Sequence, residues 1–237
     1  MTLASCDSRK TAGENPFFTE WDTPHGVPPF DKILPEHFMP AFERGMSLHE
    51  AEIDAITSNK DEATFENTIL AYDNAGQMLA QTELVFGMLC AAETNDRMQA
   101  LQEQAMPLLA AHRDKIRLDD KLFVRVKEVY DRRAALGLDA EQMRLLQKTY
   151  DSFVRAGALL DAEQKARLKE INGQLSLTAV KFGNNILAEN NNFVLELKSD
   201  ELDGLPAGIR DAAREKAQQM GKGDKWVFTL HKPSLIP

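Results

Sequence analysis

Residues 36–57 read EHFMPAFERGMSLHEAEIDAIT. Apolar side chains and one histidine recur in this stretch every three or four positions, at Phe38, Phe42, Met46, His49, Ile53 and Ile56. Positions spaced in this way lie on one face of an α-helix. The stretch therefore predicts an amphipathic helix, and because the same pattern continues, we expect a helical lobe over residues 36–190.

Two threonines mark the starts of the next helices. Thr64 is placed to cap a helix that runs to residue 92. Residues 84–92 of that helix are apolar on all sides, so we expect them, Cys90 included, to be fully buried. Thr94 is placed to cap the following helix, which contains Pro107.

Aspartates are the start signals of the later helices. Asp119 or Asp120 opens a helix that closes near Gly137. Two Asp–Gln pairs then have the three-residue spacing of a capping box, in which each side chain bonds the backbone N–H of the other residue. These pairs are Asp139 with Gln142 and Asp161 with Gln164. The second pair opens a long helix that ends at the asparagine run 190–192, with one apolar stripe at Leu168, Ile171, Leu175, Phe182 and Ile186.

The segments that flank the lobe are different in kind. Residues 15–35 are rich in proline and predict an extended arm, which aromatic residues would pack along the body of the protein. Those residues are Phe17, Phe18, Trp21 and Phe30. Residues 193–197 and 226–230 predict strands, with a helix from Pro206 to Met220 between them. The predicted fold is therefore mainly α, with a small two-strand β element near the C-terminus.

The strand–helix–strand segment 191–237 is too small to predict an independent domain. Two strands are marginal on their own unless another part of the protein covers them. We therefore expect the chain to be the N-terminal part of a longer protein.

Charge limits the classes of partner. The chain has 28 basic and 37 acidic residues, for a formal net charge of −9. Nucleic-acid and anionic-membrane surfaces are normally basic. The composition argues against both kinds of partner.

Residues 1–14 predict an N-terminal tether in which Cys6 is a candidate lipidation site. Leu3-Ala4-Ser5-Cys6 resembles the lipobox of bacterial lipoproteins. Five residues before the cysteine are too few for an export signal, so lipidation would concern a longer natural precursor. Two interpretations stay open: a lipoprotein of the cell envelope or periplasm, attached to the membrane only through Cys6, or a chance match in a cytoplasmic protein.

The residues alone identify no catalytic or metal-binding residue. The HExxH motif of zinc enzymes needs two histidines four positions apart, and in His49-Glu50-Ala51-Glu52-Ile53 the second position is isoleucine. His49 and His112 both lie on apolar helix stripes, which favours hydrogen-bonded core histidines over metal ligands. A weaker hypothesis is that His49 and Glu50 form a cryptic metal site.

Several stretches together carry a resemblance to a known family. They are NPFF (15–18), WDTP (21–24), PPFDKI (28–33), PEHFMPAF (35–42), TFENT (64–68), AHRD (111–114), FGNNIL (182–187) and WVFTL (226–230). Their kind and order resemble the beginning of the thimet oligopeptidase family of zinc metallopeptidases. The resemblance covers about residue 15 to the end of the chain and matches about the first third of the family.

The resemblance implies the N-terminal lobe of a neurolysin-like metallopeptidase, whose helices wall one side of a narrow peptide channel. It implies that the full-length protein binds zinc and removes C-terminal dipeptides from short peptides. The zinc site belongs to a later, C-terminal catalytic lobe that would be the partner of this chain. The resemblance also implies that residues 191–237 form the bridge toward that lobe. We therefore expect no catalytic residue, no zinc ligand and no activity in these 237 residues alone.

A second interpretation stays open beside the first. The chain would then be a non-enzymatic helical module that binds peptides, or the product of a decayed gene. Either of these could be anchored by a lipid at Cys6. The reading frame beyond Pro237 distinguishes the two interpretations, since only the first requires an HExxH helix there.

Overall fold

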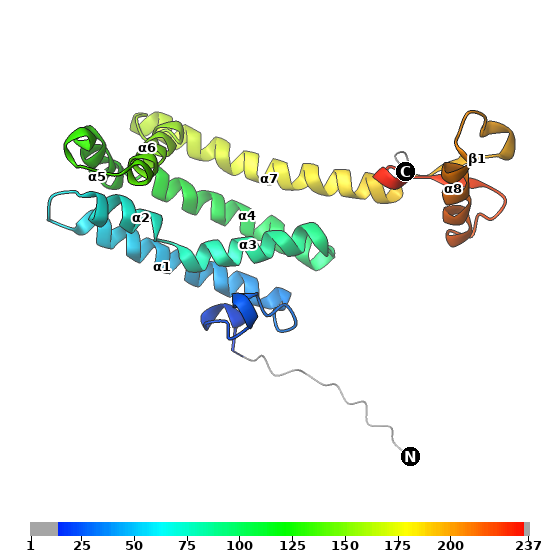
Figure 1. Ribbon diagram of the computed structural model, residues 1–237, viewed down its shortest axis with the longest axis horizontal. Helices are drawn as coiled ribbons and strands as arrows, with labels where there is room; N and C mark the ends of the chain where they lie inside the picture. Colours follow the sequence, from blue (N-terminus) through cyan, green and yellow to red (C-terminus); the bar gives the residue numbers. More distant parts are fainter. Residues whose placement is uncertain (1–13, 235–237) are drawn as a thin grey trace, which may run out of the picture. The chain divides into compact units, whose positions relative to one another are not determined.

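The computed structural model describes residues 14–234, so Cys6 and its tether lie outside the described residues. The chain divides into two compact units with the boundary after Leu177. The fold is mainly helical with one two-stranded sheet, as the sequence predicts (Figure 1). Within residues 14–234, no helix combines the length and the apolar character that crossing a membrane requires.

The elements of the N-terminal unit follow one another closely. They are the single turns η1 (Pro16–Phe18), η2 (Pro24–Gly26) and η3 (Pro35–His37), then α1 (Phe38–Ser58), the π-helical turn η4 (Phe65–Leu70), α2 (Ala71–Asp73), α3 (Gln77–Ala92), α4 (Asp96–Arg117), α5 (Asp120–Asp131), η5 (Arg133–Ala135), α6 (Ala140–Arg155) and α7 (Ala162–Asn192). The last of these begins in the N-terminal unit and ends in the C-terminal unit.

Helix α1 is the central element of the N-terminal unit. It lies beside α3 and α4, as Figure 1 shows. Its first half buries Phe38 and Phe42 in one apolar cluster with α3, α4 and the arm. Its second half buries Ile53 and Ile56 in another cluster with η4, α5 and α6. The apolar stripe that predicted α1 therefore serves two cores.

The arm is not simply extended, because three 3-10 turns interrupt it. Phe17 is buried against Phe38, with ring centroids 5.4 Å apart. Phe18 and Trp21 pack against the same cluster. Phe30, in contrast, is exposed. Three of the four aromatic residues thus hold the arm against the helices, as expected.

Side-chain caps fix most helix starts where the sequence places them. Asp119 accepts the backbone N–H of Leu122 at 2.8 Å, which settles the choice between the two aspartates. Both predicted capping boxes form, at Asp139 with Gln142 and at Asp161 with Gln164.

Two predicted boundaries are wrong by a few residues. Asn95, rather than Thr94, caps α4 by accepting the N–H of Met98 at 3.1 Å. Helix α5 ends at Asp131, and a short 3-10 turn bridges to Gly137.

The single helix predicted over residues 64–92 is also wrong, because the chain breaks at Gly76. Gly76 has a left-handed φ of +74°, and its N–H donates to Glu52 Oε2 at 2.7 Å. The ring of His49 fills the space where a side chain would begin. A contact from α1, distant in sequence, therefore separates η4 and α2 from α3.

We expect Gly76→Ala to lower the free energy of unfolding by about 2 kcal/mol or more. A left-handed conformation costs a non-glycine residue roughly 1–2 kcal/mol. The new Cβ would also lie 2.9 Å from His49 Nδ1, so the ring must move. The matched control is Gly87→Ala in α3, where a Cβ meets nothing within 4 Å. That change should stabilise the protein by about 0.5–1 kcal/mol, and a Gly76→Ala variant that is equally stable would contradict the argument. Chemical denaturation measures both.

The expectation of full burial for residues 84–92 is wrong on one face of α3. Val85 and Phe86 are buried, but Leu84 is 67% exposed and Met88 is 51% exposed. Cys90 is half-buried, and burial raises the pKa of its thiol. Helix α3 packs mainly against α1 and α4, and these two helices leave Leu84 and Met88 exposed on its other face.

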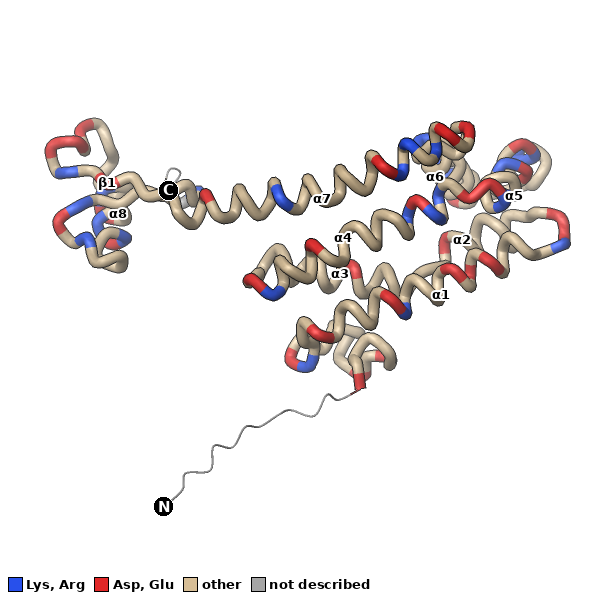
Figure 2. Tube along the Cα trace, turned by 180° about the vertical axis from the view of Figure 1, so that it is seen from behind, with Lys and Arg blue, Asp and Glu red and all other residues tan. Residues whose placement is uncertain are grey.

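Helix α7 has the predicted length, and much of its apolar stripe is exposed. Its first turns are held by an ion pair between Lys165 and Asp120 and by Asn172 Nδ2, which donates to Asp114 Oδ1 at 2.8 Å. The apolar stripe beyond Leu168 is exposed, and Phe182 reaches 66%. The middle of the helix carries no charge between Glu170 and Lys181, as the tan stretch of α7 in Figure 2 shows.

The C-terminal unit contains the predicted strand–helix–strand order. Its further elements are β1 (Leu195–Leu197), η6 (Ser199–Glu201), α8 (Ala207–Gln219), β2 (Trp226–Phe228) and η7 (Lys232–Ser234). The strands pair antiparallel with Glu196 opposite Val227. Leu202, Ala213 and Phe228 form the small core, so α8 is the cover that this sheet needs.

Candidate functional site

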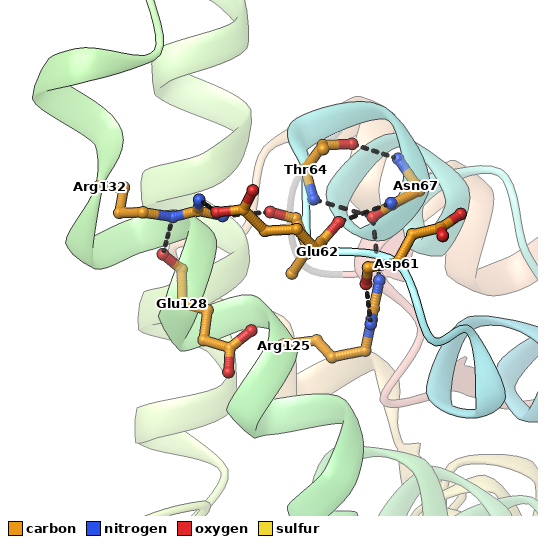
Figure 3. Close-up of polar contacts among 8 residues, drawn as sticks. Asp61, Glu62, Thr64, Asn67, Arg125, Glu128 and Arg132 are labelled. Atoms are coloured by element: carbon orange, nitrogen blue, oxygen red, sulfur yellow. Dashed lines mark hydrogen bonds and ion pairs between the residues drawn. The ribbon is translucent and has the colours of Figure 1, made fainter.

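A buried arginine organises the loop between α1 and η4. Arg125, on α5, is only 8% exposed. Its Nη1 donates to the backbone oxygens of Asn59 and Asp61 at 3.0 and 3.1 Å, and its Nη2 donates to Asn67 Oδ1 at 3.1 Å. Figure 3 shows this side chain reaching from α5 under the loop. One guanidinium thus fixes three points that lie about sixty residues earlier in the chain.

Asn67 is the centre of the TFENT stretch. Its Oδ1 accepts the backbone N–H of Thr64 at 2.8 Å and the hydroxyl of Thr68 at 2.8 Å, in addition to Arg125. Its own N–H donates to Thr64 Oγ1 at 3.1 Å, which completes a capping box. This stretch therefore has a structural explanation, since the side chains of Thr64 and Asn67 hold the backbone at the start of η4.

Arg132 supports the same loop from the end of α5. It donates to the carbonyl of Ala63 and pairs with the carboxylate of Glu62, while its Nε donates to the carbonyl of Glu128 at 3.3 Å (Figure 3). Arg125 of α5 and Arg132, which directly follows that helix, therefore position residues 59–67. Neither arginine stands out in the sequence, because nothing local marks a buried guanidinium.

His49 and His112 meet in the interior although 63 positions separate them. His49 Nδ1 and His112 Nε2 are 3.0 Å apart. His112 is buried and His49 is half-buried. Glu50 lies on the other side of His112, with Oε1 3.5 Å from Nδ1, and its Oε2 pairs with Lys115 at 2.8 Å. The expectation of hydrogen-bonded core histidines is confirmed, with each ring as the other's partner.

The pair is neutral near pH 7. Burial lowers the pKa of both rings, and the neighbouring His112 lowers the pKa of His49 further. The short contact holds one proton between His49 Nδ1 and His112 Nε2. If both of these nitrogens carried a proton, two N–H groups would point at each other. The carboxylate of Glu50 remains charged, since the Lys115 ammonium lowers its pKa.

We expect acid to destabilise the protein through this pair. The folded pKa of each ring lies below the ordinary histidine value of 6.5, so the unfolded chain binds more protons below that pH. The stabilisation is therefore complete above pH 6.5 and is lost as the pH falls below it. Thermal unfolding at about pH 7.5 and about pH 5.5 measures the loss.

A double variant isolates the contribution of the pair. His49→Gln with His112→Gln removes both titrating rings and should reduce the difference in melting temperature between the two pH values. The exposed His231→Gln is the matched control and should retain the full difference. An unchanged pH dependence in the double variant would show that other groups cause the acid effect.

The residues described do not offer a zinc site. Between residues 14 and 234, no group of three or more His, Cys, Asp or Glu side chains is arranged to hold a metal ion. The two histidine nitrogens at the contact already face each other at hydrogen-bond distance. The hypothesis of a cryptic site at His49 and Glu50 therefore lacks the third ligand it needs.

A cleft of the N-terminal unit lies between the arm and the helices α1 and α3. It has a volume of about 790 Å³ and is lined mainly by apolar side chains of the arm, α1 and α3. Arg44 stands at its wall, with the guanidinium carbon 4.5 Å from the centre of the Phe18 ring. Leu84, on the exposed face of α3, also lines the cleft. A cleft of this kind can hold apolar side chains of an extended peptide, but it contains no nucleophile paired with a base.

Comparisons with known proteins give the relatives of this chain. No protein-family model matches it. The chain is 38% identical to dipeptidyl carboxypeptidase of Escherichia coli (strain K12) over 224 residues. These aligned residues make up 94% of this chain and 33% of that protein. It is 24% identical to oligopeptidase A of the same organism over 216 residues, and this alignment covers 91% of this chain and 32% of that protein. A thimet-like oligopeptidase of Dictyostelium discoideum is 23% identical over 206 residues, 85% of this chain and 29% of that protein. The chain spans about a third of the length of the curated relatives it matches.

Proposed function

The chain belongs to the thimet oligopeptidase family of peptidases, and we propose that it is the N-terminal portion of a zinc-dependent peptidyl-dipeptidase. The whole protein would remove dipeptides from the C-termini of short peptides. The supporting observation is the similarity, over nearly the whole chain, to a dipeptidyl carboxypeptidase. The lower identity with oligopeptidase A favours this activity over that of a general oligopeptidase.

In this proposal the helices of residues 36–190 form one wall of the substrate channel. The wall has to keep its shape while peptides enter and leave, and α1 supports it by joining two buried clusters. Arg125 and the histidine pair hold loops and helices of the wall in place from inside. These residues shape the channel and do not act on the peptide.

The chemistry of peptide cleavage would come from outside this chain. Zinc, when bound, supplies a Lewis acid that lowers the pKa of its water. Residues 14–234 do not fit that metal, because they contain no suitable set of ligands. We therefore propose that the zinc ligands lie in the part of the protein that this chain does not span, and that this chain alone is inactive.

The test compares this 237-residue chain with the longest natural reading frame that contains it. Both are purified and incubated with a short peptide blocked at its N-terminus, in the presence of zinc and then of a chelator. We expect dipeptides to be released by the longer product only and chelation to abolish the release. Mass spectrometry of the products separates dipeptide release from internal cleavage, which would favour the oligopeptidase A activity instead.

Two outcomes would overturn the proposal. Chelator-sensitive hydrolysis by the 237-residue chain itself would reveal a metal site that residues 14–234 do not display. If the longer product hydrolysed no peptide, the proposed peptidase function would be contradicted.

A peptide-binding module without catalysis is the second candidate, and the cleft at the arm is the observation that favours it. In that case the 237-residue chain should bind a short apolar peptide in calorimetry. Arg44→Ala and Leu84→Ser should weaken this binding, while Lys169→Ala, on the exposed surface of α7, should not. Equal binding by all three variants would exclude the cleft as the peptide site.

We also propose that Cys6 is lipidated in the natural precursor, which would place the protein in the cell envelope. The lipobox-like sequence before it is the support for this proposal. Labelling cells with a radioactive fatty acid tests it, with Cys6→Ser as the control. Absence of label from the natural precursor would favour the cytoplasm.

A further inference from the structure

A basic pocket lies where the end of α4 meets the outer face of α6. It has a volume of about 460 Å³ and is lined by Arg117, Arg144, Lys148, Asp151, Ser152, Arg155 and Ala156. We propose that this pocket binds a small multivalent oxyanion whose chemistry is that of a di- or triphosphate chain. The proposal does not depend on the peptidase function proposed above.

The spacing of the basic residues makes them one surface. Arg144, Lys148 and Arg155 stand at intervals of four and seven residues on α6, which places them on the same side of the helix. Arg117, in the last turn of α4, adds a fourth cation from a second element. Cations from two helices can grip an anion from two directions.

The α6 cations lack protein partners, which sets them apart from most of their neighbours. Among residues 14–234, the structure gives no ion pair or hydrogen bond to the side chains of Arg144, Lys148 or Arg155. Nearby bases of the same unit do have carboxylate partners, as Arg113 has Glu83 and Lys115 has Glu50. The pocket therefore keeps its positive charge available in a chain whose net charge is −9.

The remaining polar groups of the pocket do not cancel that charge. Asp151 is the one carboxylate in its lining, and it already accepts a hydrogen bond from Gln147 Nε2 at 2.9 Å. Arg117 interacts with the hydroxyl of Tyr72, whose pKa burial raises, so the tyrosine stays neutral. Four cations thus face one carboxylate, with the Ser152 hydroxyl as a further donor.

Phosphate chains match this arrangement better than a single anion does. Guanidinium groups form paired hydrogen bonds with phosphate oxygens, and ammonium groups add a point charge. Three cations spread over α6 can each meet a different phosphate group of a chain. The volume is in the usual range of small-molecule sites, about 300–1,000 Å³, so a nucleoside attached to the chain would also fit.

Calorimetry with sodium tripolyphosphate at low ionic strength tests the proposal on the 237-residue chain. The variant carries Arg144→Gln, Lys148→Gln and Arg155→Gln. The matched control carries Lys121→Gln, Lys169→Gln and Lys181→Gln, which remove the same charge from exposed helix positions elsewhere. We expect the control to bind like the wild type and the pocket variant to bind about tenfold more weakly or worse, about 1.4 kcal/mol. Circular dichroism checks that both variants fold.

The outcomes separate the candidate ligands. ATP binding as tightly as tripolyphosphate would mean that the phosphate chain alone is recognised, and tighter ATP binding would point to a nucleotide. Citrate binding as tightly as tripolyphosphate would reduce the effect to general charge attraction and overturn the proposal. The proposal is also overturned if the wild type does not bind tripolyphosphate or if the two triple variants lose affinity equally.

Discussion

We expect Phe86→Ala to lower the free energy of unfolding by about 3–5 kcal/mol, the usual cost of removing a buried aromatic ring. Phe86, on α3, is 2% exposed. Its ring centroid lies 4.9 Å from that of Phe38 and 5.3 Å from that of Phe42, edge to face in both contacts. The change would leave a cavity where α3, α1 and the arm share one core. Urea denaturation monitored by circular dichroism measures the loss.

The neighbouring Leu84→Ala is the control for Phe86→Ala. The two residues are two positions apart on α3, but Leu84 lies on the exposed face, so its truncation should change stability by at most about 0.5 kcal/mol. The pair also tests the corrected burial of α3, because full burial of residues 84–92 would make both changes costly. A large loss in Leu84→Ala would therefore contradict the structure.

The second large effect is expected at Arg125. Arg125→Ala removes the donor for two backbone carbonyls and for Asn67 Oδ1. A hydrogen bond from a charged group contributes about 1.5–3 kcal/mol, and the three share one guanidinium, so we expect a total loss of about 3–4 kcal/mol. Equilibrium denaturation gives the size of the effect. Hydrogen exchange should show that residues 59–67 lose protection first.

Two further variants separate geometry from charge at Arg125. Arg125→Lys keeps the charge, but one ammonium cannot take the place of the fork that reaches all three acceptors, so an intermediate loss is expected. Lys121→Ala, on the exposed face of the same helix, should be nearly neutral. If Arg125→Ala were as stable as Lys121→Ala, the loop would not depend on the arginine.

The sequence predicts this fold well wherever the signal is local. A capping box involves residues three positions apart, so the starts at Asp139 and Asp161 follow directly from the sequence. The strands and the helix between them follow from the change of apolar period and from Pro206 and Gly221. The series of short motifs also indicated the family, because their order does not depend on packing.

The candidate sites depend on contacts that the sequence does not show. Arg125 meets residues 59–67, and His112 meets His49, across about sixty positions of chain. The break at Gly76 has the same origin, since Glu52 and His49 of α1 create it. The apolar pattern of residues 84–92 likewise overestimated the burial of α3, because an apolar pattern does not show which element will cover it.

The sequence by itself determined the helical class, most helix boundaries and the family, since propensities, caps and motifs act over a few residues. The tertiary structure alone decided which polar groups are buried together, which apolar faces stay exposed and which basic residues remain unpaired around the α6 pocket. The physical reason is that burial and pairing are set by the element that packs opposite, and that element comes from a distant part of the chain.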